Sequence, residues 1–201
     1  MAGKRMIIAV SGMSGAGKSS VLKHTARLLP NSVLLHFDDY DDVSIFPPDL
    51  EIWLRKGGDL CAWKTPQLAN DLEKLKAGQT ISLPGNRGIV KPAEYILVEE
   101  PFGKSRFETA QHIDFSAHID VPIDVLLARR ILRRLTEERA QLGDKIEDRL
   151  LNDIQGYLNI GRDLNIHGNQ LPKDHADLIL DGLKSIKILA EELVRALDHI
   201  R

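Results

Sequence analysis

Five short apolar runs, rich in β-branched residues, alternate along the chain with longer segments of helical periodicity. The runs cover residues 6–10, 33–37, 95–98, 117–121 and 178–180. None shows the strict apolar–polar alternation of a strand that has one face in water. Strands without that alternation, separated by helices, are typical of a parallel sheet covered on both faces. The pattern therefore predicts an α/β fold with three layers, α/β/α, around a five-stranded parallel sheet.

The intervening helical patterns cover residues 18–29, 66–77, 122–135, 144–164 and 184–200. Proline marks several boundaries: Pro30 follows the first helix, and Pro122 sits where a helix begins. Pro172 predicts the end of the last helical region before the final strand. We expect one domain over residues 1–201, with a hairpin at about 79–91 and a charged lid at about 129–149.

Residues 12–19 fit the phosphate-loop pattern G-x-x-x-x-G-K-[ST], directly after the first apolar run and directly before a helix. In this motif glycines turn backbone N–H groups toward the phosphates, the lysine reaches the β- and γ-phosphates, and the hydroxyl coordinates Mg²⁺. The motif therefore predicts a P-loop NTPase fold that binds ATP and Mg²⁺. The expected nucleotide-binding residues of this segment are Gly12, Ser14, Gly15, Ala16, Gly17, Lys18, Ser19 and Ser20.

Acidic residues follow two of the expected strands. Asp38 and Asp39 come directly after the second run, and Glu99 ends the third, with Glu100 as its rival for the same role. Ligands bind beyond the carboxyl ends of strands in open α/β sheets, so these acids should face the phosphate loop. A carboxylate there can accept a hydroxyl proton or hold Mg²⁺. The alternative for this acidic stretch is a solvated turn, which we expect for Asp41 and Asp42.

Four arginines fall within six residues, 129–134, after the fourth strand. Ile123, Leu127, Ile131 and Leu135 recur at spacings of four and predict the buried stripe of that helix. Clustered guanidinium groups repel one another unless anions lie nearby, and they match phosphate oxygens well. We therefore expect Arg129, Arg130 and Arg133 to bind ATP phosphates. The alternative is a solvated face paired with neighbouring acids, and no interleaved aromatics favour RNA.

Composition narrows the function classes. The chain has 201 residues with 43% apolar and 28% charged residues, and its net charge is −2. These are values of a globular protein without the basic excess of a nucleic-acid binder. The single cysteine, Cys61, excludes an internal disulfide, and a cytoplasmic location is the expectation. No membrane span is expected. The sequence carries no signal of oligomeric state.

The motifs together resemble the uridine kinase-like branch of P-loop kinases, which includes nicotinamide riboside kinases and relatives of phosphoribulokinase. The likeness runs from about residue 6 to residue 182 and covers nearly the whole chain. Residues 29–33 (LPNSV) and 37–40 (FDDY) resemble the riboside kinases. Residues 128–133 (ARRILR) resemble the uridine kinase lid, and residues 171–180 resemble the tail of that family.

The resemblance implies an ATP- and Mg²⁺-dependent phosphotransferase. Asp38 would deprotonate the acceptor hydroxyl, with Lys18, Arg129 and Arg133 completing the catalytic set. Metal-binding residues would be Ser19, Asp38 and Glu99. The residues expected to bind the acceptor are Asp38, Asp39, Tyr40, Lys64, Arg87 and Glu99.

The sequence departs from this family where the acceptor binds. The hairpin, residues 83–88, lacks the aromatic and histidine residues that grip a base, and Lys64 stands in place of a ribose-binding acid. The expected acceptor is therefore a nucleoside- or riboside-like molecule other than uridine. Lys64 and Arg87 would suit an anionic group on it, or would simply be surface charges. Two alternatives remain: an ATPase or switch without an acceptor, and a catalytically weak regulatory homologue.

Overall fold

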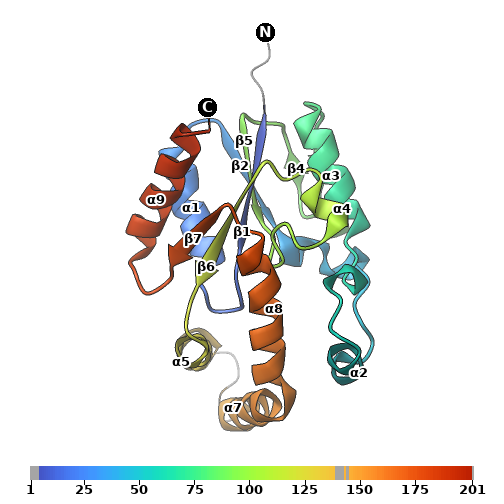
Figure 1. Cartoon of the computed structure of the whole chain (residues 1–201), viewed down its shortest axis with the longest axis vertical. Coiled ribbons are helices and arrows are strands. Elements are labelled where there is room, and N and C mark those ends of the chain that lie inside the picture. Colours follow the sequence, from blue (N-terminus) through green and yellow to red (C-terminus); the bar gives the residue numbers. More distant parts are fainter. Residues whose placement is uncertain (1–4, 139–142, 144, 201) are drawn as a thin grey trace.

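The computed structural model describes residues 5–138, 143 and 145–200. Its centre is a five-stranded sheet in the order β2-β5-β1-β6-β7, in which every neighbouring pair is parallel. The strands are β1 (Met6–Ser11), β2 (Ser32–His36), β5 (Tyr95–Glu99), β6 (Phe115–Asp120) and β7 (Leu178–Asp181). Helices cover both faces (Figure 1), so the predicted three-layer α/β fold is confirmed.

Successive residues of β1 enter two different cores. Ile8 and Val10 pack with apolar residues of α1 (Lys18–Leu28) and α9 (Ile186–Asp198). Ile7 and Ala9 pack with leucines of α3 (Pro66–Lys76) on the other face, where α4 (Phe107–Ala110) also lies (Figure 1). Because both faces are buried, the strand needs apolar residues at every position, which explains its continuous apolar run.

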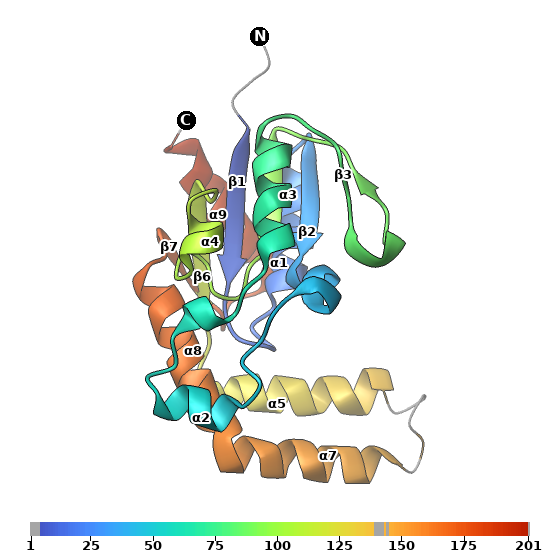
Figure 2. The ribbon, with the colours of Figure 1, turned by 90° about the vertical axis from the view of Figure 1, so that its right-hand side faces the viewer.

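The remaining helices lie beyond the carboxyl ends of the strands. Figure 2 shows α5 (Ile123–Arg133) and α7 (Lys145–Gly156) side by side below the sheet, with α2 (Leu50–Arg55) at about the same level toward the left of the view. A π-helical turn, Arg134–Glu138, extends α5, and another, Tyr157–Gly161, joins α7 to α8 (Arg162–Asp174). The expected lid falls on α5 and the start of α7, and residues 139–142 and 144 of it lie outside the described residues.

The expected hairpin consists of β3 (Ile81–Ser82) and β4 (Ile89–Val90), which pair antiparallel. The prediction that Pro172 ends the last helical region was wrong, because α8 continues through it to Asp174. Pro172 is buried close to the end of the helix, where its missing N–H removes one intrahelical bond.

The predicted buried stripe of α5 is also wrong in detail: Leu126 is buried, whereas Leu135 just beyond the helix is 39% exposed. The helix lies below the sheet instead of packing along it (Figure 2). Of its residues only Leu126 is buried, so its apolar face is only partly covered.

Four short elements escaped prediction because each is too brief to show a period. They are α2 and α4, together with 3₁₀ turns over Phe37–Val43 and Leu60–Ala62. None of the helices described in residues 5–138 and 145–200 is both long and apolar enough to cross a bilayer.

Candidate functional site

The loop between β1 and α1 has the backbone geometry of a phosphate cradle. Gly12, Gly15 and Gly17 have φ values of 137°, 91° and 97°, a region that other L-residues rarely adopt. A Cβ on Gly12 would lie 3.0 Å from the carbonyl oxygen of Ile119, and one on Gly15 would lie 3.1 Å from that of Leu126. Glycine is therefore required at both positions by conformation and by space.

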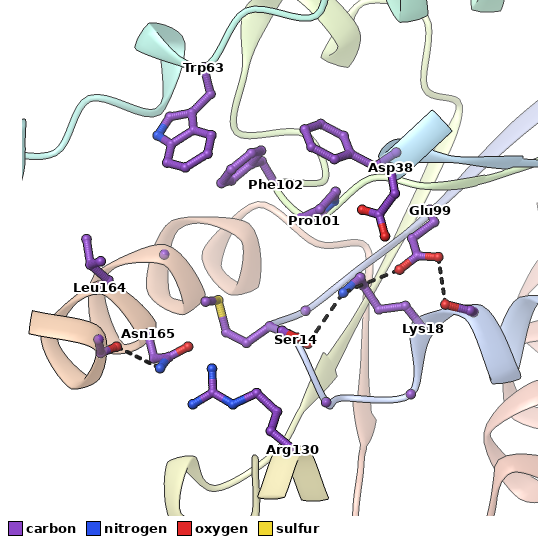
Figure 3. Close-up of a pocket in the computed structure, with 18 of the residues that line it drawn as sticks. Ser14, Lys18, Asp38, Trp63, Glu99, Pro101, Phe102, Arg130, Leu164 and Asn165 are labelled. Carbon is purple, nitrogen blue, oxygen red and sulfur yellow. Dashed lines mark hydrogen bonds and ion pairs between the residues drawn. The ribbon is translucent and has the colours of Figure 1, made fainter. Parts of the chain in front are cut away.

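Glu99 connects the phosphate loop to the neighbouring strands. Its Oε1 lies 3.5 Å from Lys18 Nζ, and its Oε2 accepts a hydrogen bond of 2.8 Å from Ser19 Oγ (Figure 3). His36 Nδ1 lies 3.1 Å from the same Oε2. Lys18 Nζ also donates to the carbonyl of Met13 at 3.4 Å, inside the loop. The strand-end acid thus holds the lysine and the hydroxyl of the motif in one network.

This network keeps Glu99 ionised. Burial works to raise the pKa of Glu99, but the hydrogen bond with His36, the charge of Lys18 and the hydroxyl of Ser19 outweigh it and lower the pKa to about 2. Burial lowers the pKa of Lys18, against the opposing effect of Glu99. The hydrogen bond to Glu99 raises the pKa of His36. A fixed carboxylate beside a hydroxyl is a donor set that suits a hard divalent cation.

Glu99 and Glu100, the two acids at the end of β5, have different surroundings. Glu100 is fully buried, and its Oε2 accepts a 2.6 Å hydrogen bond from Arg106 Nη2. Burial raises the pKa of Glu100, although Arg106 opposes the shift. Glu99 is therefore the acid that faces the phosphate loop.

Asp38 lies on the 3₁₀ turn that follows β2, and it lines the pocket beside the phosphate loop. Figure 3 shows its carboxylate pointing toward Lys18. Tyr40 from the same turn is buried instead, and its hydroxyl donates to Asp71 Oδ2 on α3 at 3.1 Å. The structure therefore makes Tyr40 an anchor of the turn and leaves Asp38 at the pocket, whereas Asp39 lies half-buried outside the described lining.

Lys64 and Arg87, the two cations expected to bind an anionic group of the acceptor, do not line this pocket. Lys64 is exposed, and its backbone pairs with Ile45 in an isolated bridge. Arg87, on the hairpin, forms an ion pair of 2.8 Å with Asp42 and donates to the carbonyl of Asp39 at 3.1 Å. Both side chains lie outside the described lining of the pocket, so the structure favours the alternative that Lys64 and Arg87 are surface charges.

Three of the four clustered arginines line the pocket: Arg129, Arg130 and Arg133. Arg129 Nη2 donates to the carbonyl of Gly182 at 2.9 Å, and the Arg130 guanidinium lies 5.5 Å from the centre of the Tyr157 ring. Burial lowers the pKa of Arg130. Arg134 is instead paired with Asp153 at 2.9 Å. Within the phosphate loop, Ser14, Ser19 and Ser20 line the pocket, whereas Ala16 is buried behind it.

The pocket has a volume of about 780 Å³, and it has two ends of different character. The phosphate end is formed by the phosphate loop, Glu99 and the three arginines. The other end, which we call the aromatic wall, is formed by Phe37, Phe46, Trp53, Trp63 and Phe102. Leu164 and Asn165 of α8 lie across from Trp63 and Phe102 (Figure 3).

The rings of the wall contact one another. The ring centres of Phe46 and Trp63 are 5.3 Å apart, those of Trp53 and Trp63 are 5.9 Å apart, and those of Trp63 and Phe102 are 5.5 Å apart. Sequence reasoning missed this wall. The available signal was the density of aromatic residues between positions 37 and 63, in a chain with only 5% aromatic residues.

The chain is similar in sequence to several uridine kinases, although no family model matches it. A uridine kinase from Brevibacillus brevis is 29% identical over 191 residues, which cover 89% of this chain and 85% of that protein. A uridine kinase from Halobacterium salinarum is 26% identical over 203 residues, which cover 94% of this chain and 86% of that protein.

Solved structures show the same fold. One described as a possible uridine kinase from Bacillus stearothermophilus has a TM-score of 0.54 at 18% identity, covering 90% of this chain and 91% of that chain. Shikimate kinase from Acinetobacter baumannii has a TM-score of 0.54 at 16% identity, covering 98% of this chain and 95% of that chain. In sequence and in fold the chain is therefore uridine kinase-like, and the findings together support a P-loop small-molecule kinase.

Proposed function

We propose that the chain transfers the γ-phosphate of ATP to a hydroxyl group of a small molecule, with Mg²⁺ as its metal. The acceptor would be a nucleoside- or riboside-like molecule other than uridine. The observation that carries this proposal is the meeting of Asp38, Lys18 and Glu99 in one pocket. A base, a phosphate-binding cation and a metal-binding acid are the parts that phosphoryl transfer needs.

The residues present fit a nucleoside triphosphate. Lys18 and the three pocket arginines supply four cations at the phosphate end, where the glycine backbone turns around the cradle. The N-terminus of α1 opens at Lys18 and adds its positive end. Guanidinium groups would contact phosphate oxygens in pairs and would offset the charge of the transferring group.

The residues also fit Mg²⁺. This ion binds in proteins through one or two side-chain oxygens and completes its shell with phosphate oxygens and water. Ser19 Oγ and Glu99 Oε2, 2.8 Å apart, would form the protein side of such a site, with Asp38 close by. When bound, Mg²⁺ would neutralise charge on the phosphates. Within the described residues, no group of three or more His, Cys, Asp or Glu side chains is arranged to hold a metal by itself.

In the proposed reaction Asp38 accepts the proton of the acceptor hydroxyl. The hydroxyl oxygen forms a bond to the γ-phosphorus, and the bond from that phosphorus to the bridging oxygen of ADP breaks. The products are a phosphate ester and ADP. Lys18 holds the β- and γ-phosphates in line with the hydroxyl, and Arg129 and Arg133 stabilise the spread charge.

The test is an acceptor screen with purified protein and Mg·ATP. Nucleosides, ribosides, sugars and vitamins would be offered separately, and both ADP and the phosphorylated product would be measured, the product by mass spectrometry. A product formed with one class of alcohol supports the proposal. ADP released at one slow rate with every compound, and no ester with any, would instead indicate an ATPase, a switch or a regulatory homologue.

A further inference from the structure

The aromatic wall is the part of the pocket that the phosphate chemistry leaves unused. It consists of five rings from three separate segments: the turn after β2, the stretch from Phe46 to Trp63, and the loop after β5. At its mouth Phe46 is 36% exposed, and both tryptophans are partly exposed. Aromatic surface left open in a pocket is typical of a binding site for an apolar ligand.

Contacts on the side of the rings away from the pocket fix the arrangement of the aromatic wall. Arg106 is only 1% exposed, and its guanidinium lies 4.9 Å from the Phe102 ring centre and 5.5 Å from that of Phe37. Arg106 also donates to the backbone carbonyl of Trp63 and is paired with Glu100. Trp53 is fixed separately, because its indole N–H donates to the carbonyl of Asp59 at 2.8 Å. Rings fixed before a ligand arrives lose little freedom on binding.

Charge is distributed unevenly along the pocket. The cations of its described lining are Lys18 and three arginines, and all of them belong to the phosphate end. The acids Asp38 and Asp41 follow Phe37 on the same turn, next to the wall. Lys64 and Arg87, the cations that could have served an anionic acceptor, lie outside the described lining. The cation behind the rings, Arg106, is 1% exposed and paired with Glu100, so it does not offer a free charge to the pocket. A negative group placed at the wall would therefore meet rings and carboxylates.

We propose that the aromatic wall selects an acceptor that carries a flat, apolar ring and no anionic group. This inference rests on the proposed function, because it assigns the wall to the acceptor and the opposite end to ATP. The ring lies against Trp63 and Phe102, and the hydroxyl to be phosphorylated reaches Asp38 beside Phe37. Stacking on the wall supplies affinity, while the acids beside it disfavour a carboxylate or a phosphate.

The chain offers a binding assay that is independent of catalysis. Its two tryptophans, Trp53 and Trp63, both belong to the wall, so tryptophan fluorescence reports on this end of the pocket. The probes are benzyl alcohol and para-(hydroxymethyl)benzoate, which share a ring and a hydroxymethyl group and differ by one carboxylate. We expect saturable quenching by benzyl alcohol, and an affinity for the carboxylate lower by about tenfold or more.

A matched pair of variants tests whether benzyl alcohol binds at the aromatic wall. Phe102→Leu should weaken benzyl alcohol binding about three- to tenfold, the loss expected for one ring contact. Phe107→Leu is its control, because Phe107 lies on α4 and is 77% exposed. Phe46→Leu, at the exposed mouth, is a second wall variant. The rise in melting temperature with Mg·ATP, measured for each, shows that the phosphate end is intact.

The outcomes separate this inference from the proposed function. Equal or tighter binding of the carboxylate, or unchanged affinity in both wall variants, overturns the inference. Phosphorylation of glycerol, which has no ring, at a higher kcat/KM than benzyl alcohol also overturns it while supporting the kinase. Ring-selective binding without phosphoryl transfer to any alcohol overturns the proposed function and the assignment of the ring to an acceptor, and it leaves the wall as a site for an uncharged ring.

Discussion

The hydroxyl of Ser19 donates a 2.8 Å hydrogen bond to Glu99 Oε2, although the two residues lie 80 positions apart in the sequence. The contact joins the first turn of α1 to the end of β5, on the strand that neighbours β1. It brings the hydroxyl of the phosphate loop and the strand-end carboxylate to one point. The remaining oxygen of Glu99 is shared with Lys18, so one acid orients both reactive side chains of the motif.

Replacing this carboxylate tests the metal site directly. Glu99→Gln keeps the shape of the side chain but removes the charge that would hold Mg²⁺ with Ser19. We expect the transfer rate to fall about 10- to 100-fold and the Mg²⁺ concentration for half-maximal rate to rise. Initial rates across a Mg²⁺ titration measure both. Glu73→Gln, an exposed acid on α3, is the control. An unchanged Mg²⁺ dependence in Glu99→Gln would remove Glu99 from the metal site.

Asp38→Asn tests the proposed base. The amide cannot accept the acceptor's proton, so kcat should fall about 10²- to 10⁴-fold, the usual contribution of general base catalysis. The affinity for ATP, measured by calorimetry with Mg²⁺ present, should stay within a few-fold because Lys18 and the pocket arginines, which would contact the phosphates, are unchanged. Asp42→Asn serves as control on the same turn, where Asp42 pairs with Arg87. Lost ATP binding with a normal kcat would contradict this role for Asp38.

The buried pair of Arg106 and Glu100 predicts a stability effect. Arg106→Met leaves the fully buried Glu100 without its ion-pair partner, so the free energy of unfolding should fall by about 3 kcal/mol or more. Adding Glu100→Gln removes the unpaired acid and should recover a large part of the loss. Urea unfolding of the two single variants and the double variant measures the coupling. Additive losses in this cycle would show that the pair is not energetically coupled.

His118 predicts how stability depends on pH. Burial, as the largest cause, lowers its pKa to about 4 from the ordinary value of 6.5, and its Nδ1 lies 3.0 Å from Ser11 Oγ. Well above pH 6.5 the histidine is neutral in both the folded and unfolded states and contributes no pH dependence. As the pH falls below 6.5, His118 binds a proton in the unfolded chain but stays neutral in the folded chain until the pH approaches 4. Stability should therefore fall by about 3 kcal/mol between pH 6.5 and pH 4.

The check is urea unfolding across that pH range for the parent chain and for His118→Gln, which cannot titrate. The variant starts less stable, because it alters a buried side chain, but its stability should change less between pH 6.5 and pH 4. Parallel curves for the two proteins would show that another group causes the loss. Glu99, whose pKa is lowered from 4.5 to about 2, adds a separate loss that begins near pH 4.5 and continues toward pH 2, and this loss should be the same in both proteins.

The sequence predicts those parts of the site in which neighbouring residues act together. The phosphate loop is one contiguous motif, and Asp38 and Glu99 are found by the rule that ligands bind at strand ends. The aromatic wall follows no such rule. Phe37, Trp63 and Phe102 are far apart in the sequence and meet only because the segment after β2 crosses to the loop after β5.

Contacts between distant segments, which the sequence pattern does not contain, also explain why the prediction placed Lys64 and Arg87 at the pocket. Their places in the motif pattern match acceptor-binding positions, but the direction of each side chain depends on contacts outside the motif. Arg87 pairs with Asp42 outside the pocket lining, and Lys64 is exposed on a segment whose backbone pairs with Ile45. A pattern of residue types along the chain does not contain this information.

The division of the pocket into two ends has a consequence for how such a protein can diversify. The phosphate end is built from residues whose neighbours also form the sheet core, such as Val10 and Val21, so changes there endanger folding. The stretch from Phe46 to Trp63 supplies three of the five rings of the wall and contributes none of the residues of either core cluster in the described part of the chain. Under the proposed function, substitutions in that stretch would change which alcohol is accepted, while the nucleotide site and the scaffold would stay as they are.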